Sequence, residues 1–508
     1  MRLLLSVFVC IFFSSSVFGQ VAPKDFKLQH GTYTVGFQHF LKVDSTRTYK
    51  KVFQWTHKSI PRPIPVSIWY PATEKSSTKT TILTYLEIFK AEREWEQLPN
   101  EQLLNWFPYP VNNAHNRAML HDETQAFINS NVANGKFPVI IYAPSYEASS
   151  IENFILCEYL ASHGFVVISS PSRGAETKYF TGGTAKDLEA QARDIEFLLQ
   201  KTLSLPYADT EKIATMGFSF GGLSNVLTQM RNDCIKAIVS LDGSIRYNYK
   251  TLKTSAFADI SKVDVPFIHM AQKDIPEAVL KADKIDPKLN HEFTFYDSLV
   301  HSNAYKLKFH DLTHSNFSSF GILFQPRDKR QDKNDVKILA SYKLVSKYTL
   351  HFLNAYLKND QASLQFLENT PSQNEIPSSL LSKTSKKATP KPFIFQDFND
   401  LAAKQQYQNL QSLYQKLLQK HPKLELAEWK LNNLGLQLSY QPKTSQQGIL
   451  VFQFATYLYP KSANLYDSLA EAYVFMNDHK NAIRNFEKSL ALNPKNQNAI
   501  DRLKQLRK

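Results

Sequence analysis

The sequence predicts an α/β protein: a mostly parallel sheet flanked by helices, followed by a smaller all-α domain. Between residues 136 and 358, short apolar runs alternate with amphipathic helical patterns, as expected of a parallel sheet. After residue 396 the pattern becomes wholly helical and repeats at an interval of 34 residues. With 508 residues and a hydrophobic content of 43%, the chain is long and apolar enough for more than one core.

The first 20 residues, MRLLLSVFVCIFFSSSVFGQ, have the pattern of a secretory signal peptide. Arg2 supplies the positive charge, residues 3–13 form the apolar core, and Val17-Phe18-Gly19 is a small-residue cleavage site before Gln20. The apolar run is too short to cross a bilayer as a helix, and no later stretch is long and apolar enough. We therefore expect residues 1–19 to be removed from an exported protein, periplasmic or secreted, without a transmembrane segment.

Residues 26–360 are predicted to form the main domain. Within it, residues 26–72 alternate in the manner of strands and are expected to be antiparallel strands at one edge of the sheet. Residues 84–130 are helical in pattern and rich in aromatic side chains, so they form either a cap over the site or an ordinary pair of packing helices. An amphipathic helix over residues 336–358 is expected to close the domain.

A short buried strand runs into Gly217-Phe218-Ser219-Phe220-Gly221, and a helix follows. This G-x-S-x-G pattern between a strand and a helix is the nucleophile elbow of α/β-hydrolases, and the alternative is a glycine-rich turn without chemistry. The serine of an elbow is held in a strained conformation, and the glycines remove Cβ atoms where strand and helix cross. The main domain is therefore predicted to have the α/β-hydrolase fold, with Ser219 as its nucleophile.

The partners of Ser219 should follow in the order acid, then histidine. His314 lies in the loop after the last predicted strand of the sheet, where an imidazole can reach the serine. His310 lies within that strand and is expected to be packed or to have its hydrogen bonds satisfied there. Asp242 in SLDGS and Asp274 in AQKD both end strands at the carboxyl edge of the sheet. Either carboxylate could orient the imidazole, so the pattern alone leaves the acid open.

Several motifs are similar to those of the platelet-activating-factor acetylhydrolases, of the secreted and type II kind, which are near the dienelactone hydrolases. They are GFSFGG at the elbow, LASHGF at 160–165, HSNFSSF at 314–320, and the early GTYTVG and IWYPA stretches. The resemblance covers residues 30 to 360. It implies an acid after the strand that follows the elbow, which is Asp242, 23 residues beyond Ser219. The related bacterial lipases and cutinase-like polyesterases have the acid one strand later, where Asp274 stands.

The oxyanion hole is expected to use the backbone N–H of Phe220 and a second N–H from the loop after the strand at 138–142. The resemblance places the family's His-Gly-Leu segment on Pro144, Ser145 and Tyr146, which implies the N–H of Tyr146 as the second donor. The sequence lacks the His-Gly pair at this place. This departure concerns the shape of the acyl pocket and therefore the choice of substrate.

These observations predict an exported serine carboxylic-ester hydrolase that works through an acyl-Ser219 intermediate. The resemblance implies short-chain acyl esters as substrates, phospholipid-type esters among them, and no metal or other cofactor. The net charge of +14 is spread along the chain without a Lys/Arg-rich block, so a nucleic-acid partner is not expected. Cys157 and Cys234 show neither a disulfide framework nor metal-ligand spacing, and they either pair or remain as two buried thiols.

Residues 361–396 are rich in Ser, Thr, Lys and Pro and are predicted to be a linker. Residues 397–508 are predicted to form a tetratricopeptide-repeat domain, with an unrelated helical bundle as the alternative. Four positions of the last repeat match positions 34 residues earlier, while the preceding helix fits only with a one-residue slip. The matched pairs are Gly448 and Ala482, Phe452 and Phe486, Ala455 and Ser489, and Pro460 and Pro494. The rival from another functional class is a non-catalytic scaffold whose repeats recognise a protein partner.

Overall fold

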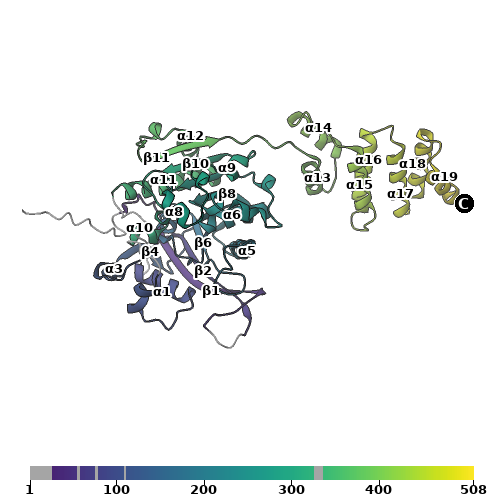
Figure 1. Cartoon of the computed structure of the whole chain (residues 1–508). Coiled ribbons are helices and arrows are strands. Elements are labelled where there is room, and N and C mark those ends of the chain that lie inside the picture. The colour runs from purple at the N-terminus through teal and green to yellow at the C-terminus, as the bar shows by residue number, and fades with distance from the viewer. Residues whose placement is uncertain (1–25, 54–57, 75–77, 108–109, 325–335, 508) are drawn as a thin grey trace, which may run out of the picture. The chain divides into compact units, whose positions relative to one another are not determined.

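The structure is a computed structural model that describes residues 26–53, 58–74, 78–107, 110–324 and 336–507. The chain divides into two compact units, one ending at Thr389 and the other beginning at Pro390 (Figure 1). The predicted signal peptide lies outside the described residues. Among the helices of the described part of the chain, none has the length and apolar character needed to cross a membrane.

The first unit is built around one sheet, in which the described residues form eleven strands in the order β11-β10-β9-β8-β7-β5-β6-β2-β1-β4-β3 (Figure 1). Its centre is parallel, as predicted. The parallel strands are β5 (Phe137–Ala143), β6 (Val166–Ser169), β7 (Ala208–Phe218), β8 (Ile235–Leu241), β9 (Phe267–Ala271) and β10 (Ala304–Phe309). Successive parallel strands are therefore joined by crossover connections over one face of the sheet or the other. The alternation of strand and helix patterns in the sequence indicates connections of this kind.

The two leading strands are antiparallel, as expected. β1 (Thr34–Tyr49) pairs with β2 (Ile60–Ala72), from Thr34 opposite Ala72 to Tyr49 opposite Ile60. They do not form the edge of the sheet, however, because β4 (Glu123–Ile128) pairs with β1 and β3 (Lys79–Thr81) lies beyond it. The edge strands escaped prediction because β4 is short and follows a stretch of helical, aromatic sequence.

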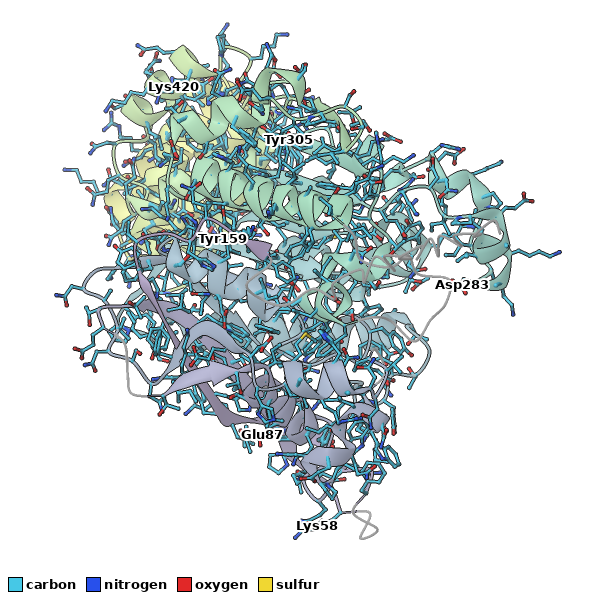
Figure 2. All side chains as sticks on the ribbon, turned by 90° about the vertical axis from the view of Figure 1, so that its left-hand side faces the viewer. Lys58, Glu87, Tyr159, Asp283, Tyr305 and Lys420 are labelled. Atoms are coloured by element: carbon cyan, nitrogen blue, oxygen red, sulfur yellow. The ribbon has the colours of Figure 1, made fainter. Side chains whose placement is uncertain are left out.

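Two hydrophobic cores cover the two faces of the sheet. Ile140 and Tyr142 of β5 belong to one core, and Val139 and Ile141 belong to the other, as alternation along a strand requires. The helices α1 (Ile82–Glu92), α4 (Phe154–Ser162) and α11 (Val336–Leu357) supply the first core, and α5 (Ala185–Thr202) and α6 (Phe220–Arg231) supply the second. Figure 2 shows the side chains that fill these layers and labels Tyr159 on α4 and Tyr305 on β10, both in the first core.

The aromatic-rich segment between β3 and β4 forms α1, the 3-10 helix η2 (Asn100–Gln102), α2 (Leu103–Trp106) and α3 (Ala114–Met119). Phe89 and Phe107 are buried in the first core, which is the role of ordinary packing helices. Their neighbours Trp95 and Trp106 line a cavity described below. The segment therefore packs on the first core, and its role as a cap over the site stays a prediction.

The predicted linker is wrong over residues 361–386. α12 (Gln361–Glu368) packs on α11, and β11 (Leu381–Lys386) pairs antiparallel with β10, with Leu381 opposite Phe309. An edge strand has a partner on one side and solvent on the other, so it tolerates polar residues, and lysines there discourage pairing with another chain. The composition that suggests a linker is in this case that of an edge strand, and the first unit extends to Thr389.

The second unit consists of helices, and one pair of them has the predicted spacing of 34 residues. The helices are α13 (Phe395–Lys404), α14 (Leu410–Lys420), α15 (Glu428–Ser439), α16 (Ser445–Leu458), α17 (Ala463–Phe475), α18 (His479–Leu492) and α19 (Gln497–Leu506). α16 and α18 begin and end 34 residues apart, whereas α15 and α17 begin 35 residues apart, which is the predicted slip. A Cβ atom on Gly448 would lie 2.2 Å from the Ser439 hydroxyl, so α15 and α16 cross closely at this glycine.

Cys157 and Cys234, the cysteines in the described part of the chain, are unpaired. Cys157 is buried in α4, as expected of a free thiol, and burial raises its pKa well above the usual value. Cys234 is exposed in the turn before β8, so the expectation of two buried thiols holds only for the first.

Candidate active site

Ser219 stands alone between β7, which ends at Phe218, and α6, which begins at Phe220. Its φ of 52° and ψ of −118° are rare for a residue with a Cβ atom, so surrounding contacts must hold this conformation. A Cβ atom on Gly217 would lie 2.5 Å from the Gly221 carbonyl carbon, and one on Gly221 would lie 2.0 Å from the Ala143 oxygen. Both glycines are therefore required for the close crossing of strand and helix that the elbow motif predicts.

A chain of two hydrogen bonds joins Asp242, His314 and Ser219. The Nε2 atom of His314 lies 2.9 Å from the Ser219 Oγ, and its Nδ1 atom lies 2.6 Å from the Asp242 Oδ2. The three residues follow β7, β8 and β10, so they meet at the carboxyl edge of the sheet. Asp242 is fully buried and Ser219 is 9% exposed, whereas the His314 side chain is 37% exposed. The imidazole thus lies between a buried carboxylate and the solvent side of the site.

Asp242 is fixed by the end of the neighbouring strand. Its N–H donates to the Met270 carbonyl at 2.7 Å, and its Oδ1 accepts a hydrogen bond from the Gln272 N–H at 3.1 Å. One carboxylate oxygen is therefore held by backbone while the other faces His314. A charged acceptor makes short, strong hydrogen bonds of this kind.

The other two candidates lie elsewhere. Asp274 is exposed and forms an ion pair with Lys308 at 2.6 Å, which is a surface contact between neighbouring strands. His310 lies just after β10 rather than within it and is exposed, so it is not packed, but its Nε2 has a polar partner in the Ser382 hydroxyl at 3.4 Å. β10 ends at Phe309, and this places His310 outside the strand.

The segment that carries His314 is held from two sides. The 3-10 helix η6 (His314–Phe317) is capped by Thr313, whose N–H donates to the Asn316 side chain at 2.9 Å. From the other side, the Asn153 amide donates to the Phe317 carbonyl at 3.0 Å. The imidazole also lies against the Phe218 ring, with ring centres 4.9 Å apart. Asn153 and Gln272 were not predicted, because each acts through a backbone contact that leaves no motif.

The two predicted oxyanion donors belong to neighbouring segments. Phe220 is the first residue of α6, and Tyr146 lies in the loop that follows β5. In the described part of the chain, neither backbone N–H donates to another protein group. The Tyr146 ring packs edge-on against Phe180 and Phe220, with ring centres 4.6 and 6.0 Å away. Both N–H groups are thus available to a ligand, which is the condition for an oxyanion hole.

A cavity of about 420 Å³ borders the loop that carries Tyr146. Its walls are mainly aromatic, and they come from the segment before β4, from the loop after β5 and from α10 (Ser319–Leu323); the lining residues are Phe89, Arg93, Trp95, Trp106, Phe107, Tyr146, Glu147, Ala148, Ser149, Glu152 and Phe320. Arg93 stacks over the Trp95 ring at 5.6 Å and donates to the Glu147 carbonyl at 2.9 Å. The cavity therefore offers an apolar surface with one charged pair beside it.

Two buried ionisable groups near the site have shifted pKa values. Burial raises the pKa of Glu152 to about 6, against the opposing effect of hydrogen bonds from Ser145 and Tyr142. Burial lowers the pKa of His269 to about 3, and its Nδ1 lies 2.9 Å from the Ser240 hydroxyl. His269 is therefore neutral at ordinary pH. Among the described residues, no group of three or more His, Cys, Asp or Glu side chains is arranged to hold a metal ion.

Comparisons with known proteins give a family match and a structural neighbour. A protein-family model described as PET hydrolase-like matches residues 121–386, a range that includes the elbow, Asp242 and His314. A search of curated proteins found no match. Among solved structures, the ferulic acid esterase from Streptomyces cinnamoneus is 18% identical, with a TM-score of 0.49; the similarity covers 70% of this chain and 97% of that one.

The matched range is just over half of the 508 residues. The predicted likeness to the acetylhydrolases in particular stays a prediction. The chain belongs to the PET hydrolase-like family, and it is a carboxylic ester hydrolase with the α/β-hydrolase fold.

Proposed function

We propose that this protein is an exported serine esterase that hydrolyses short-chain acyl esters, phospholipid-type esters among them, through an acyl-Ser219 intermediate. The observation that carries the proposal is the unbroken hydrogen-bond chain from Asp242 through His314 to the Ser219 hydroxyl. The strained elbow supports it, since strain of this kind persists at sites where it serves a mechanism.

In the first half-reaction, His314 Nε2 takes the proton of Ser219 as its Oγ attacks the ester carbonyl. Asp242 accepts from Nδ1–H, so the lone pair of Nε2 faces the serine and the imidazolium that forms is stabilised. The imidazolium then gives its proton to the departing alcohol, which leaves an acyl ester on Ser219. In the second half-reaction, His314 takes a proton from water as the water attacks the acyl group, and the imidazolium then returns this proton to the Ser219 Oγ as the free acid leaves.

The negative charge on the carbonyl oxygen requires donors on the opposite side. We assign the backbone N–H groups of Phe220 and Tyr146 to this task, because both are free to donate to a ligand. Loss of one such donor in a serine hydrolase typically lowers kcat about 10²–10³-fold.

The cavity supports two classes of ester. The first is a short-chain acyl ester, which the acetylhydrolase resemblance implies. The aromatic walls from Trp95, Trp106 and Phe107 favour a second candidate, an ester of an aromatic acid, and the family match points the same way. A series of 4-nitrophenyl esters of increasing chain length, compared with alkyl benzoates, separates the two by their kcat/KM values.

The decisive test is Ser219→Ala. Alanine keeps the backbone of the elbow and removes the nucleophile, so ester hydrolysis is expected to fall by several orders of magnitude in a folded protein. The matched control is Ser302→Ala, because Ser302 is a fully buried serine that donates only to the Val263 carbonyl at 3.0 Å. Normal turnover by the Ser219 variant would overturn the proposal.

We further propose that the second unit consists of tetratricopeptide repeats that bind a protein partner. The 34-residue spacing of α16 and α18 supports this assignment, and Trp429, Tyr440 and Phe475 are exposed aromatic side chains of the kind used in recognition. A scaffold without catalysis is disfavoured by the intact site, and labelling by a fluorophosphonate probe decides between them. Amino-terminal sequencing of the mature protein tests the proposed export, with Gln20 expected as the first residue.

A further inference from the structure

The loop 145–150, which carries Tyr146, begins at a buried carboxylate. Glu152 is 1% exposed, and its carboxylate accepts hydrogen bonds from the Ser145 N–H at 2.9 Å, the Ser145 hydroxyl at 2.5 Å and the Tyr142 hydroxyl at 3.2 Å. Ser145 directly precedes Tyr146 in the chain. Glu152 therefore holds the peptide that leads into the proposed oxyanion donor.

The far end of the same loop is held by a second buried carboxylate. Glu92, the last residue of α1, is 2% exposed and accepts from the Ser150 N–H at 2.9 Å and the Ser150 hydroxyl at 2.6 Å. The Ser149 hydroxyl also donates to Glu92. Both ends of a six-residue loop are thus bound to carboxylates that lie away from water.

Asn153, the residue after Glu152, contacts the segment that carries His314. Asn153 donates to the Phe317 carbonyl at the end of η6, and its side-chain oxygen accepts from the Ser319 and Tyr342 hydroxyls at 3.1 and 3.2 Å. The Glu152–Asn153 turn is therefore fixed from the side of His314 while it holds the loop of Tyr146. A rigid connection of this kind sets the distance between the two halves of the site.

Burying a carboxylate is expensive, and apolar residues of similar volume often give equal or greater stability. Two buried glutamates on one short loop therefore call for a reason other than stability. An oxyanion donor must lie within a few tenths of an ångström of its place, because a displacement of 1 Å can cost about 10²-fold in rate. The loop 145–150 contains no helix or strand that could provide such accuracy.

We propose that Glu152 and Glu92 are positioning residues that fix the loop 145–150, so that the Tyr146 N–H points at the oxyanion. Neither glutamate touches the reacting atoms. The inference rests on the proposed function, in particular on Tyr146 as the second donor. Glu152 is expected to matter more than Glu92, since it binds the residue next to the donor.

The test is Glu152→Gln in the full chain. The amide keeps the size of the side chain but replaces one acceptor oxygen by a donor, which opposes the hydroxyl or the N–H of Ser145. We expect kcat to fall about 10- to 100-fold with KM changed less than about threefold, since the loss falls on the transition state. Inhibition by a trifluoromethyl ketone, whose oxyanion needs the same donors, should weaken by a similar factor. Glu92→Gln should lower kcat by about threefold to tenfold.

The matched control is Glu158→Gln. Glu158 is also a buried carboxylate, six residues further along the chain in α4. It accepts hydrogen bonds from the Tyr85 hydroxyl at 2.7 Å, the Thr124 hydroxyl at 2.7 Å and the Gln125 N–H at 3.0 Å. None of these donors belongs to the loop 145–150. Its variant should lose thermal stability as the Glu152 variant does, while kcat stays within about twofold.

Equal loss of kcat in both variants at equal loss of Tm would overturn the proposal, because the effect would then be structural. A folded Glu152 variant with unchanged kcat and unchanged trifluoromethyl ketone affinity would also overturn it. If Glu152→Gln does not fold, Ser145→Ala removes one of the three donors, and an unchanged kcat there has the same meaning. Fluorophosphonate labelling of Ser219 in the wild-type protein, tested separately, shows whether the proposed function itself fails.

Discussion

The two units of this protein bury different kinds of polar group. The first unit buries carboxylates and cations, including Glu92, Glu152, Glu158, Asp242 and Arg62, whereas the second, over its described residues, buries no charged residue, and its buried polar residues are Ser439, Ser445, Thr456 and Ser489. A buried charge costs several kcal/mol unless hydrogen bonds compensate it, while a hydroxyl on a helix can donate to its own backbone. The comparison indicates that the first unit loses some stability by burying charged groups, which in return hold polar side chains in fixed positions. The second unit is held together mainly by the packing of apolar side chains.

The largest effect expected from this difference is in the catalytic acid. Asp242→Asn should lower kcat about 10⁴-fold, because an amide at this position favours the wrong tautomer of His314. Asp274→Asn is the matched control, since that carboxylate is exposed and pairs only with Lys308, and its kcat should stay within about twofold. Steady-state kinetics on 4-nitrophenyl acetate, with melting curves as a check on folding, measures both. If Asp274→Asn lowered kcat strongly and Asp242→Asn did not, the catalytic acid would be Asp274, one strand further along the sheet.

A core substitution in the second unit should act on stability alone. Phe452 is fully buried, and a Cβ atom on Gly435 would lie 2.7 Å from its ring, so the two helices meet closely at this point. Phe452→Ala should lower the free energy of unfolding of the second unit by about 3–5 kcal/mol. The kcat for small esters should not change. Calorimetry should show a lower Tm for the transition of the second unit and an unchanged Tm for that of the first. A parallel loss of ester hydrolysis would mean that the two units depend on each other.

Acid should weaken the first unit through His269. Its pKa is about 3 in the folded protein and near 6.5 when unfolded, so the unfolded chain takes up the proton first as the pH falls. The contribution of His269 is therefore complete above pH 6.5 and is lost progressively down to pH 3. At pH 5 the loss is about 2 kcal/mol, at about 1.4 kcal/mol per pH unit.

The measurement compares urea unfolding of wild-type protein and His269→Asn at pH 7 and pH 5. The difference between the two proteins removes the opposite contribution of Glu152, whose raised pKa costs stability as the pH rises from 4.5 to about 6. Asp242, Arg246 and Lys306 also act on His269, and they are the same in both proteins. An equal acid loss in the two proteins would contradict the assignment.

The sequence predicted those parts of the site that are written into local patterns. The elbow around Ser219 is one continuous motif, and His314 follows the last strand of the parallel series, so both could be identified from neighbouring residues. Asp242 and Asp274 could not be separated by pattern, since each ends a strand and the choice depends on which loop turns toward the imidazole. The resemblance favoured Asp242, which is the carboxylate that the structure brings to His314.

Glu92 and Glu152 escaped prediction because they lie 60 residues apart and meet only through the loop between them. The signal that was present is the run SYEASSIEN, unusually polar for residues that directly follow a fully buried strand. β11 was missed for a different reason. Its lysines and hydroxyls suit solvent on one side, and only the three-dimensional partner β10 distinguishes such an edge strand from a linker.

The smallest effect is expected from removing the second unit, and a matched pair of truncations makes it informative. A chain that ends at Thr389 keeps β11 and the whole of the first sheet, so its kcat for 4-nitrophenyl acetate should stay within about twofold of the full chain. A chain that ends at Leu380 loses β11, leaves one edge of β10 unpaired and removes the buried Leu381. Because an unpaired strand edge invites association, this shorter chain should give less soluble protein and a lower Tm. An insoluble chain ending at Thr389 would show that the first unit needs the second, and a normal chain ending at Leu380 would show that residues 381–389 act as the linker their composition suggests.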